Sequence, residues 1–257
     1  MPKLSVVKIG GAVIEDSQKL YRFLEDFAKI KGPKILVHGG GKKATEMAKK
    51  LNIPIKIKEG RRITDSATLE VITGIYGGQI NKKIVAQLQR FNCNALGLSG
   101  ADGNAIRAKK RPVKTIDFGF VGDITSVNRE LFIALLSQNI CPVCCALSHD
   151  GNGQLLNTNA DTIAAEIGKN LAQDFETALY FCFEMSGVMK DVNDPSSLIE
   201  RITKKDYKEL LENNILSQGM LPKMHNAFDA LENGVREVAI GSTEMINTNT
   251  SYTSITL

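Results

Sequence analysis

The sequence lacks any hydrophobic run long enough to cross a membrane. A spanning helix needs about 20 consecutive apolar residues, and charged or polar side chains interrupt every stretch of that length in this 257-residue chain. The apolar core of a secretory signal is also missing, because Lys8 divides the first hydrophobic segment. We therefore expect a cytoplasmic protein with no membrane partner.

The sequence also lacks a strong excess of one charge. Its formal net charge is only +4, and its 32 basic residues are spread along the chain apart from two short clusters. Binding to nucleic acid normally requires a basic patch or stripe. We therefore expect no nucleic-acid partner.

Metal-ligating side chains are few, with three histidines and five cysteines. Cys141, Cys144 and Cys145 lie close to His149, which resembles the spacing of a metal site, but a closed zinc site needs four ligands and His225 lies far along the chain. The favoured interpretation is a buried strand that uses cysteine as a small apolar residue. We predict reduced thiols and no protein ligand for a metal.

What the sequence does contain is two strands that each end in glycines. The segment Leu4 to Ile9 is followed by Gly10 and Gly11, and the segment Lys34 to His38 is followed by three glycines and a helical pattern. Glycine lets the main chain approach phosphate oxygens closely, and a helix N-terminus adds partial positive charge. Two such loops on neighbouring strands could hold one phosphoryl group.

The order of the predicted elements indicates an α/β fold. Ser17 can cap a helix, and this helix and another that starts near Lys42 alternate with strands, which predicts a parallel sheet with helices on its faces. A half-exposed hairpin is expected at residues 52–64, and a long helix containing three glycines at residues 66–91. Two short hairpin-like stretches are expected at residues 105–114 and 118–127. The tail, residues 247–257, is either a last strand or a frayed end.

Two nucleotide-binding alternatives can be weighed for the second glycine loop. A P-loop is excluded, because Lys43 follows Gly41-Lys42 where serine or threonine is required. A dinucleotide-binding oxidoreductase remains an alternative, since the segment from Gly39 to Ala44 satisfies G-x-G-x-x-A and Glu59 follows at the expected distance. The next strand should then be buried, yet residues 53–58 alternate apolar residues with lysine and proline.

Seven motifs, taken together and in order, resemble those of the N-acetylglutamate kinases of the amino acid kinase family. The resemblance covers roughly residues 4 to 241. The motifs are Lys8-Ile9-Gly10-Gly11, His38-Gly39-Gly40-Gly41, Gly60-Arg61-Arg62-Ile63-Thr64, Gly97-Leu98-Ser99-Gly100-Ala101-Asp102-Gly103, Gly119-Phe120-Val121-Gly122, Asn157-Thr158-Asn159-Ala160-Asp161 and Gly219-Met220-Leu221-Pro222-Lys223-Met224.

This resemblance implies a three-layer αβα sandwich with a mainly parallel central sheet. It implies an N-terminal lobe, residues 1–175, for acylglutamate binding and dimerisation, and a C-terminal lobe, residues 176–257, for ATP. The implied reaction transfers the γ-phosphoryl group of ATP to the side-chain carboxylate of an N-acylated glutamate, with Mg²⁺ accompanying the ATP. Phosphoryl transfer depends mainly on positioning and on cations placed around the developing charge, which suits these residues.

The resemblance also assigns roles to individual residues. Lys8 and Lys223 would flank the transferring group as cations, and Asp161 would hold their ammonium groups in place. Arg62 and Asn157 would bind the α-carboxylate and the acyl amide of the substrate. Backbone amides of Gly10, Gly11 and Gly40 would bind phosphate, Gly40 and Gly41 would also contact the substrate, and the nucleotide would be bound by Glu184, Ser186, Gly187, Leu216, Ser217, Gly219 and Met220.

Some features depart from the family pattern and leave alternatives open. Phe183-Glu184-Met185 stands where relatives usually have Thr-Asp-Val, with Glu184 at the acidic position, so the individual nucleotide contacts are left open. Arg61 precedes Arg62 where relatives usually have an apolar residue, so N-succinylglutamate is an alternative substrate if both arginines face inward, although neighbouring residues on a hairpin face opposite ways. A non-catalytic regulator that binds the same ligand is a further alternative.

The resemblance gives two expectations about assembly and regulation. We expect a homodimer built on the helix around Ile72 to Ile84, where glycines would allow a partner helix to approach closely. The chain begins a few residues before its first strand, without the extra N-terminal helix of arginine-regulated relatives. We therefore expect no feedback inhibition by arginine.

Overall fold

The computed structural model describes residues 1–58, 61–191, 193–213, 215–216, 220–247 and 250–257. Its residues form two compact units: a middle unit, Leu36–Ile163, and a terminal unit that combines Met1–Ile35 with Ala164–Leu257. The predicted lobe boundary after residue 175 concerns which ligand each part binds, and it stays a prediction.

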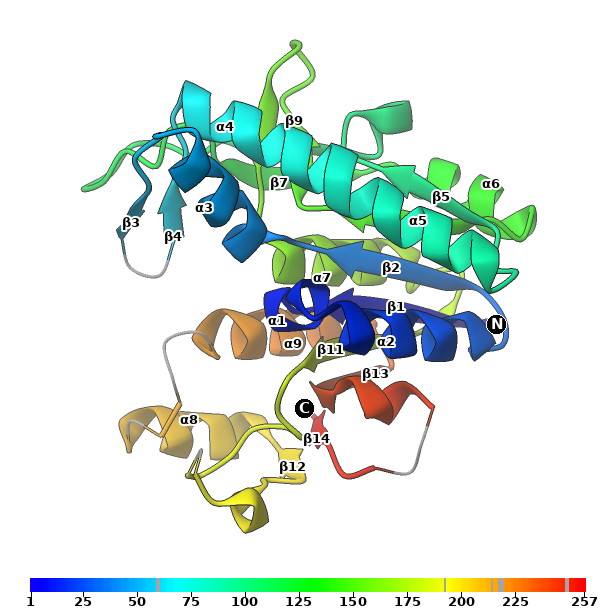
Figure 1. The fold of residues 1–257 in the computed structure, drawn as a ribbon. Coiled ribbons are helices and arrows are strands. Elements are labelled where there is room, and N and C mark those ends of the chain that lie inside the picture. The colour runs from blue at the N-terminus through cyan, green and yellow to red at the C-terminus, as the bar shows by residue number, and fades with distance from the viewer. Residues whose placement is uncertain (59–60, 192, 214, 217–219, 248–249) are drawn as a thin grey trace. The chain divides into compact units, whose positions relative to one another are not determined.

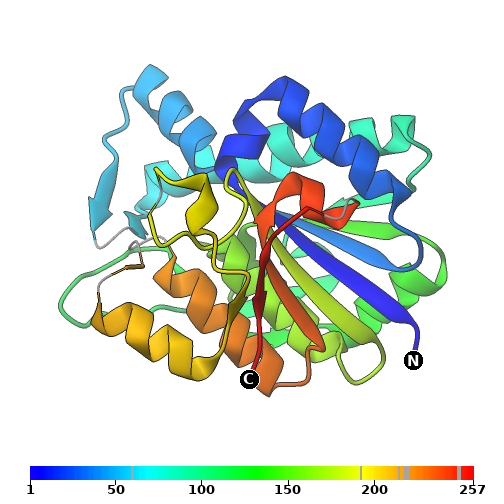
Figure 2. The same cartoon turned by 90° about the horizontal axis from the view of Figure 1, so that it is seen from below.

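The described residues of the terminal unit form five strands. Their order is β12-β14-β13-β11-β1, in which β1, β11 and β13 are parallel neighbours and β14 is antiparallel to β13. Helix α2 covers one face of these strands and α9 the other (Figure 2). The strands are β1 (Lys3–Ile9), β11 (Glu176–Phe183), β12 (Arg201–Ile202), β13 (Glu237–Ser242) and β14 (Thr253–Ile255), and the helices are α1 (Gly11–Glu15), α2 (Ser17–Lys29), α8 (Lys204–Glu212) and α9 (Leu221–Glu232), with short 3₁₀ turns at Pro195–Ser197 and Thr243–Ile246. Helix α7 (Ala160–Leu171) crosses the boundary between the two units.

Among its described residues, the middle unit contains three further parallel strands, in the order β2-β8-β5. A four-stranded sheet, β10-β9-β6-β7, and the hairpin β3-β4 complete its strands. The strands are β2 (Lys34–His38), β3 (Lys56–Lys58), β4 (Arg61–Ile63), β5 (Ala95–Leu98), β6 (Ile106–Lys110), β7 (Gly122–Val127), β8 (Cys141–Cys145), β9 (Leu147–His149) and β10 (Leu155–Asn157). The helices are α3 (Gly41–Lys50), α4 (Ser66–Ile72), the π-helix η1 (Thr73–Ile80), α5 (Asn81–Arg90) and α6 (Arg129–Ser137), with a 3₁₀ turn at Asp102–Asn104.

The predicted fold class is confirmed. The chain is an α/β protein with a mainly parallel central sheet between layers of helices. The central strands are buried on both faces, as parallel strands require: Leu4, Val6, Val7 and Ile9 of β1 are all fully buried. Their burial explains why the sequence of each central strand is an almost unbroken apolar run.

The cysteine strand is also as predicted. All five residues of β8 are buried, and all five cysteines of the chain are free thiols. Burial raises the pKa of the Cys145 thiol to about 12, which keeps it protonated. Within the described ranges, no three or more histidine, cysteine, aspartate or glutamate side chains gather where they could hold a metal ion.

The long helix predicted over residues 66–91 is continuous, with its glycines inside a π-helical segment. Figure 1 shows α4, η1 and α5 following one another along one axis. A Cβ atom added at Gly74 or Gly78 would meet nothing within 4 Å, so these two glycines lie on an open face of the helix.

Three local expectations are corrected or decided by the structure. Helix α2 is capped by Asp16 and not by Ser17, because the Asp16 carboxylate accepts hydrogen bonds from the amides of Gln18 and Lys19. The two short hairpins predicted at 105–114 and 118–127 are wrong, since β6 and β7 pair with each other across one longer connection. The tail forms a last strand, β14, paired with β13.

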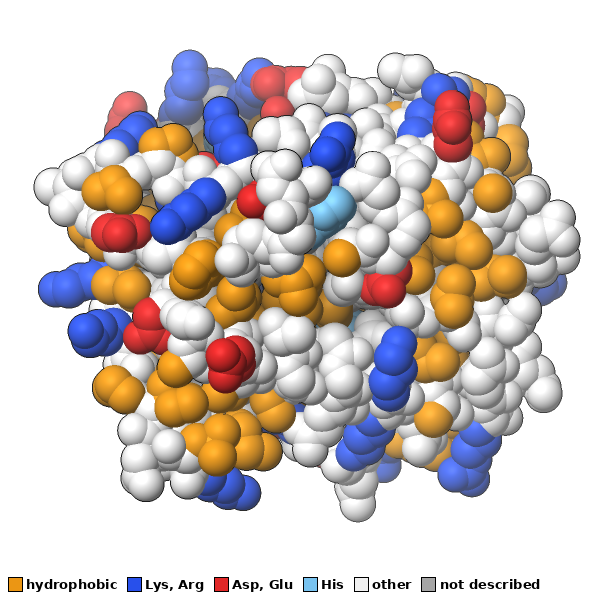
Figure 3. All heavy atoms as spheres, turned by 90° about the horizontal axis from the view of Figure 1, so that it is seen from above, with side chains coloured by type: hydrophobic (Ala, Val, Ile, Leu, Met, Phe, Trp, Pro, Cys, Tyr) orange, Lys and Arg blue, Asp and Glu red, His pale blue; other side chains and the backbone are white. Residues whose placement is uncertain are grey.

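Two findings concern the apolar length of the helices and the distribution of charge on one face of the surface. No helix among the described residues is long and apolar enough to span a membrane. Lys and Arg side chains are dispersed over the face shown in Figure 3 instead of gathering in one basic patch.

Candidate functional site

In the terminal unit, the predicted residues gather at one edge of the sheet. The parallel register aligns Ile9 with Cys182 and Cys182 with Gly241, so β1, β11 and β13 end together. Open α/β sheets bind ligands at the carboxyl ends of their strands. Lys8 lies near this edge and is only 8% exposed, which is unusual for a lysine side chain.

Lys223 approaches the same edge from a helix. It is the third residue of α9, which leads into β13 through a connection of only a few residues, so the helix runs antiparallel to that strand. The first turn of α9 therefore lies towards the carboxyl end of β13. The topology thus brings two lysines, one buried and one half-buried, to one end of the terminal unit.

The first glycine loop makes a backbone hydrogen bond that the sequence does not indicate. The backbone N–H of Gly10 donates to the carbonyl of Cys182 at 2.8 Å, which continues the ladder between β1 and β11. The Gly10 amide is therefore already used within the protein, which argues against its predicted role as a phosphate donor. Gly11 begins helix α1, and first-turn amides have no acceptor within their own helix.

The predicted nucleotide-binding residues differ in their exposure to solvent, and two of them lie outside the described residues. Glu184 and Ser186 follow β11 and are exposed. Gly187 is buried, and a Cβ atom there would come within 2.6 Å of Leu198 and 2.5 Å of Thr253, so packing alone explains this glycine. The remaining predictions are Leu216 and Met220, which are half-exposed, and Ser217 and Gly219, which lie outside the described residues.

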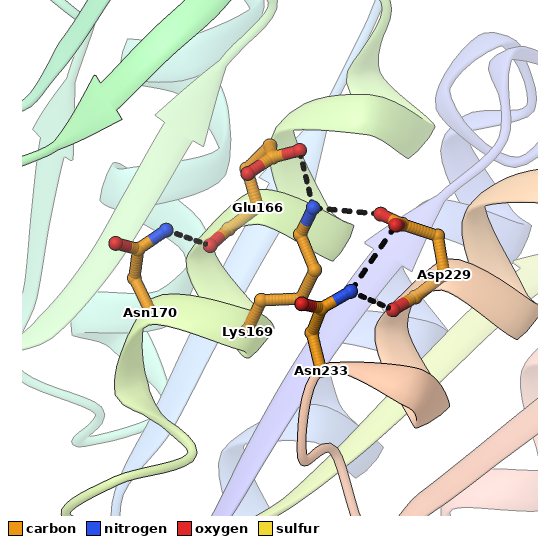
Figure 4. Close-up of polar contacts among 5 residues, drawn as sticks. All are labelled: Glu166, Lys169, Asn170, Asp229 and Asn233. Atoms are coloured by element: carbon orange, nitrogen blue, oxygen red, sulfur yellow. Dashed lines mark hydrogen bonds and ion pairs between the residues drawn. The ribbon is translucent and has the colours of Figure 1, made fainter.

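A charged cluster ties helices α7 and α9 together within the terminal unit. The Lys169 ammonium lies 2.6 Å from both the Glu166 and the Asp229 carboxylates (Figure 4). Burial acts to lower the pKa of Lys169, but the two carboxylates outweigh it, so the pKa is raised. Asn233 also donates to Asp229. The cluster fixes the helix that carries Lys223.

The second glycine loop, in the middle unit, is shaped by the π-helix. Gly40 has φ +156° and ψ 25°, and a Cβ atom there would overlap Cδ1 of Ile80 and lie 3.0 Å from the Tyr76 ring. Only glycine fits at this point. Helix α3 begins at the next residue, Gly41, so its first-turn amides face the loop end without partners inside the helix.

Arg62 is held beside this loop. Its Nη2 donates to the carbonyl of Gly41 at 2.9 Å and to the Thr45 hydroxyl at 2.7 Å, and Thr45 in turn donates to Gly41. The Nη1 atom of Arg62 is buried and makes no hydrogen bond to any described residue. A buried guanidinium nitrogen without an acceptor is costly, and it indicates a place for an anionic ligand.

Asn157 is connected to Arg62 through Thr64. The Asn157 side-chain amide donates to the Thr64 hydroxyl at 3.0 Å, and Thr64 lies two residues after Arg62 on the same segment. Thr64 is fully buried, so the contact holds β10 against the end of β4. The structure thus brings together three of the predicted substrate residues: Gly41, Arg62 and Asn157.

Thr45 is a candidate site residue that sequence reasoning missed. It lies one turn after Gly41 on α3, and its hydroxyl anchors the Arg62 guanidinium. The only signal in the sequence was that spacing, a hydroxyl four residues after the last glycine. By contrast, Arg61 is exposed, so the two adjacent arginines differ as alternation on a hairpin requires.

Asp161 occupies the first turn of α7. Its side chain is 5% exposed, and Asn159 caps the helix by accepting hydrogen bonds from the amides of Asp161 and Thr162. A carboxylate in the first turn is favoured by the helix dipole, which is one reason for an acidic residue here. A favourable interaction with the helix dipole does not require burial, so it does not explain why the Asp161 side chain is almost fully buried.

Comparison with known proteins identifies the family. The model of the amino acid kinase family matches residues 3–242. An acetylglutamate kinase from Phocaeicola vulgatus is 50% identical over 245 residues, which cover 95% of each chain. Another from Parabacteroides distasonis is 50% identical over 240 residues, covering 93% of this chain and 94% of that one. The chain belongs to the amino acid kinase family.

The fold of a solved structure agrees with this membership. A Streptococcus mutans protein superposes with a TM-score of 0.79 and 24% identity, covering 98% of both chains. Membership in the amino acid kinase family also removes the dinucleotide-binding alternative. The decisive local feature is β3, whose residues Lys56, Ile57 and Lys58 are all exposed on a two-stranded hairpin and so cannot be the buried strand which that alternative requires.

Proposed function

We propose that the protein transfers the γ-phosphoryl group of ATP to the side-chain carboxylate of N-acetyl-L-glutamate, a step of arginine biosynthesis. Relatives of about half identity over nearly the whole chain bear the name acetylglutamate kinase. The observation that carries the proposal is Arg62, whose Nη1 is buried beside the second glycine loop and lacks an acceptor among the described residues. The α-carboxylate of an acylglutamate would supply that acceptor.

The substrate contacts follow from this placement. Nη2 of Arg62 is fixed by Gly41 and Thr45, so the guanidinium plane is set before the ligand arrives. Such preorganisation reduces the entropic cost of binding. Asn157, held by Thr64, presents its side-chain oxygen and remaining amide hydrogen to the acyl amide of the substrate. Gly40 and Gly41 form the floor of the same site.

The reaction needs no general base. The side-chain carboxylate of the substrate is ionised at neutral pH, and one of its oxygens forms a bond to the γ-phosphorus while the bond to the β,γ-bridging oxygen breaks and ADP leaves. Lys8 and Lys223 supply positive charge to the transferring group, where it stabilises the transition state more than the ground state. Asp161 orients their ammonium groups. The amides of Gly11 and Gly40 are the proposed backbone donors.

The nucleotide is ATP, and Mg²⁺ is proposed to arrive with it. The residues that the structure describes offer no cluster of three metal ligands, so the ion would be held chiefly by the phosphates and water, as Mg²⁺ often is. Glu184, Ser186, Leu216 and Met220 are the described candidates for contacts with the nucleotide. The division into an acylglutamate lobe, 1–175, and an ATP lobe, 176–257, is part of this proposal, as is a cytoplasmic location.

A homodimer is also proposed. Gly74 and Gly78 lie one turn apart on the open face of η1, where a partner helix could approach closely. Replacing Gly78 with arginine should convert the dimer to monomers in light scattering. A chain that is monomeric without any substitution would contradict this part of the proposal.

The adjacent arginines offer a matched test of the substrate site. Arg62→Lys should raise KM for N-acetylglutamate by roughly 10-fold or more, because lysine cannot reproduce the fixed fork of the guanidinium. Arg61→Lys, one residue away and exposed, should leave KM unchanged. Release of ADP measured over a range of substrate concentrations gives both values. If the two substitutions changed KM equally, Arg62 would no longer support the proposed function.

Measurement of ADP release also tests which acyl group the substrate carries, and whether the protein is an enzyme or a non-catalytic regulator that binds the same ligand. The exposed position of Arg61 supports the acetyl substrate, since neighbouring residues on a hairpin face opposite ways and Arg62 is the less exposed of the two. A higher kcat/KM for N-succinylglutamate than for N-acetylglutamate would overturn that choice. No release of ADP with either acylglutamate would favour a non-catalytic ligand-binding protein.

A further inference from the structure

His38 is the first residue of the second glycine motif, and the proposed reaction gives its side chain no role. It is the last residue of β2, its side chain is fully buried, and it directly precedes the three glycines. Buried histidines need hydrogen-bond partners for both ring nitrogens. The partners of His38 indicate what it does.

The orientation of its first partner, Asn81, is fixed by two neighbours. The Asn81 side-chain Nδ2 donates to the carbonyl of Val143 at 2.9 Å, and its Oδ1 accepts from the Lys82 ammonium at 3.2 Å. A carbonyl can only accept and an ammonium can only donate, so the amide cannot be turned around. Its second Nδ2 hydrogen therefore points to Nε2 of His38, 3.1 Å away.

This arrangement determines the proton position on His38. Since Nε2 accepts from Asn81, the neutral ring carries its proton on Nδ1, which lies 2.8 Å from the carbonyl oxygen of Gly39 and donates to it. Burial, only partly offset by the Gly39 hydrogen bond, lowers the pKa of His38 to about 4, so the ring is neutral near pH 7.

The hydrogen bond to Gly39 has a geometric consequence for the next residue. The Gly39 carbonyl and the Gly40 N–H belong to one planar trans peptide and point in opposite directions. Holding the carbonyl towards His38 therefore turns the Gly40 N–H away from it. Without this bond the peptide could rotate, because glycines on both sides place few limits on the backbone.

We propose that His38 is a positioning residue: held by Asn81, it fixes the plane of the Gly39–Gly40 peptide and so aims the Gly40 amide at the transferring phosphoryl group. This inference rests on the proposed function. Asn81 itself depends on Gly97 of β5, where a Cβ atom would overlap the Asn81 Oδ1 atom. The chain of contacts thus runs from β5 and β8 through α5 to the glycine loop.

Two substitutions of His38 test the hydrogen bonds of its two ring nitrogens separately. In His38→Asn the side-chain amide nitrogen can take the place of Nδ1 and keep the donor to Gly39. In His38→Gln the amide group reaches the place of Nε2, which keeps the contact with Asn81 but loses that donor. We expect His38→Gln to lower kcat by roughly 10-fold to 10²-fold, with KM for ATP and N-acetylglutamate changed by less than about 3-fold. His38→Asn should keep kcat within about 5-fold of the unmodified protein.

A matched control separates positioning from stability. Leu88 is fully buried on the same helix as Asn81, and Leu88→Ala should lower the melting temperature without lowering kcat. An unchanged kcat in His38→Gln, or equal losses in both His38 variants, would overturn the proposal. If the unmodified protein shows no activity on N-acetylglutamate, the proposed function fails instead.

A second measurement needs no activity and no substitution that might prevent folding. Nitrogen NMR of protein labelled with ¹⁵N-histidine distinguishes the two neutral tautomers, and the chain has only three histidines to assign. We expect the His38 proton on Nδ1 at pH 7. A proton on Nε2, or on both nitrogens, would contradict the inferred orientation of the Gly39–Gly40 peptide.

Discussion

The two glycine loops look alike in sequence but are built differently. After β1, Gly10 has an ordinary φ of −74° and donates its amide to Cys182, and a charged residue, Lys8, precedes the loop. After β2, Gly40 has φ +156° and lies against Ile80, and a neutral buried histidine precedes the loop. We infer that the first loop serves mainly through its lysine and the second through the direction of its backbone. Glycine is required by the protein's own packing only in the second.

The largest expected effect concerns the cation of the first loop. Lys8→Met should lower kcat by about 10²-fold or more with a smaller change in KM, because the ammonium is proposed to act mainly in the transition state. Lys3→Met, at the exposed opposite end of the same strand, is the matched control and should be silent. Steady-state kinetics of both variants decides the point, and an unaltered kcat in Lys8→Met would remove the distinction between the loops.

The next effect concerns the shape of the second loop. Gly40→Ala should cost about 1–3 kcal/mol of stability, because the new methyl group overlaps Ile80 and approaches the Tyr76 ring. Adding Ile80→Val removes the Cδ1 atom and should recover part of the loss. Urea unfolding of the single and double variants measures both. Full stability in Gly40→Ala would show that the loop does not need glycine for packing.

The neutral histidine of the second loop gives a pH-dependent effect. The pKa of His38 falls from 6.5 in the unfolded chain to about 4 in the folded protein, so the unfolded chain binds the proton more tightly. Its contribution is fully present above pH 6.5 and is lost as the pH falls towards 4. We expect His38 to account for about 2 kcal/mol of stability lost between pH 7.5 and pH 5. Urea unfolding at both values should show that much less is lost in His38→Gln, and an identical loss would contradict the burial argument.

The smallest expected effect on stability belongs to the first loop. A Cβ atom at Gly11 would have only the flexible end of Glu15 nearby, at 3.8 Å, so Gly11→Ala should change stability by no more than about 1 kcal/mol. If kcat nevertheless falls, a ligand must approach this position closely, as proposed for phosphate. Thermal unfolding together with kinetics separates the two results, and a large loss of stability would contradict the comparison.

Much of the fold could be predicted because the spacing of apolar residues and the positions of glycines are local features of the sequence. The central strands, the exposed hairpin and the long helix follow from apolar spacing and glycine positions. What the sequence could not show depends on distant partners: the Gly10 amide is taken by Cys182, and β6 pairs with β7 across a connection that contains turn residues of its own. The cap of α2 was misplaced by one residue because Asp16 and Ser17 are both good capping residues.

Part of the candidate site could be proposed from the sequence. Arg62 and Asn157 belong to recognisable motifs, and the structure places them in one hydrogen-bonded group with Thr64. Thr45 and Asn81 carry no such signal, since a single polar residue within a helical pattern is most often exposed. Their roles became visible only from the atoms they contact, the Arg62 guanidinium and the His38 ring.

The central claim, transfer of a phosphoryl group to a carboxylate, is tested most directly by its product. An acyl phosphate reacts with hydroxylamine to give a hydroxamate, which forms a coloured complex with ferric iron. The proposed function predicts hydroxamate in amounts matching the ADP released, only when the protein, ATP, Mg²⁺ and N-acetyl-L-glutamate are all present, and strongly reduced in Lys8→Met. Release of ADP and free phosphate without hydroxamate would contradict it.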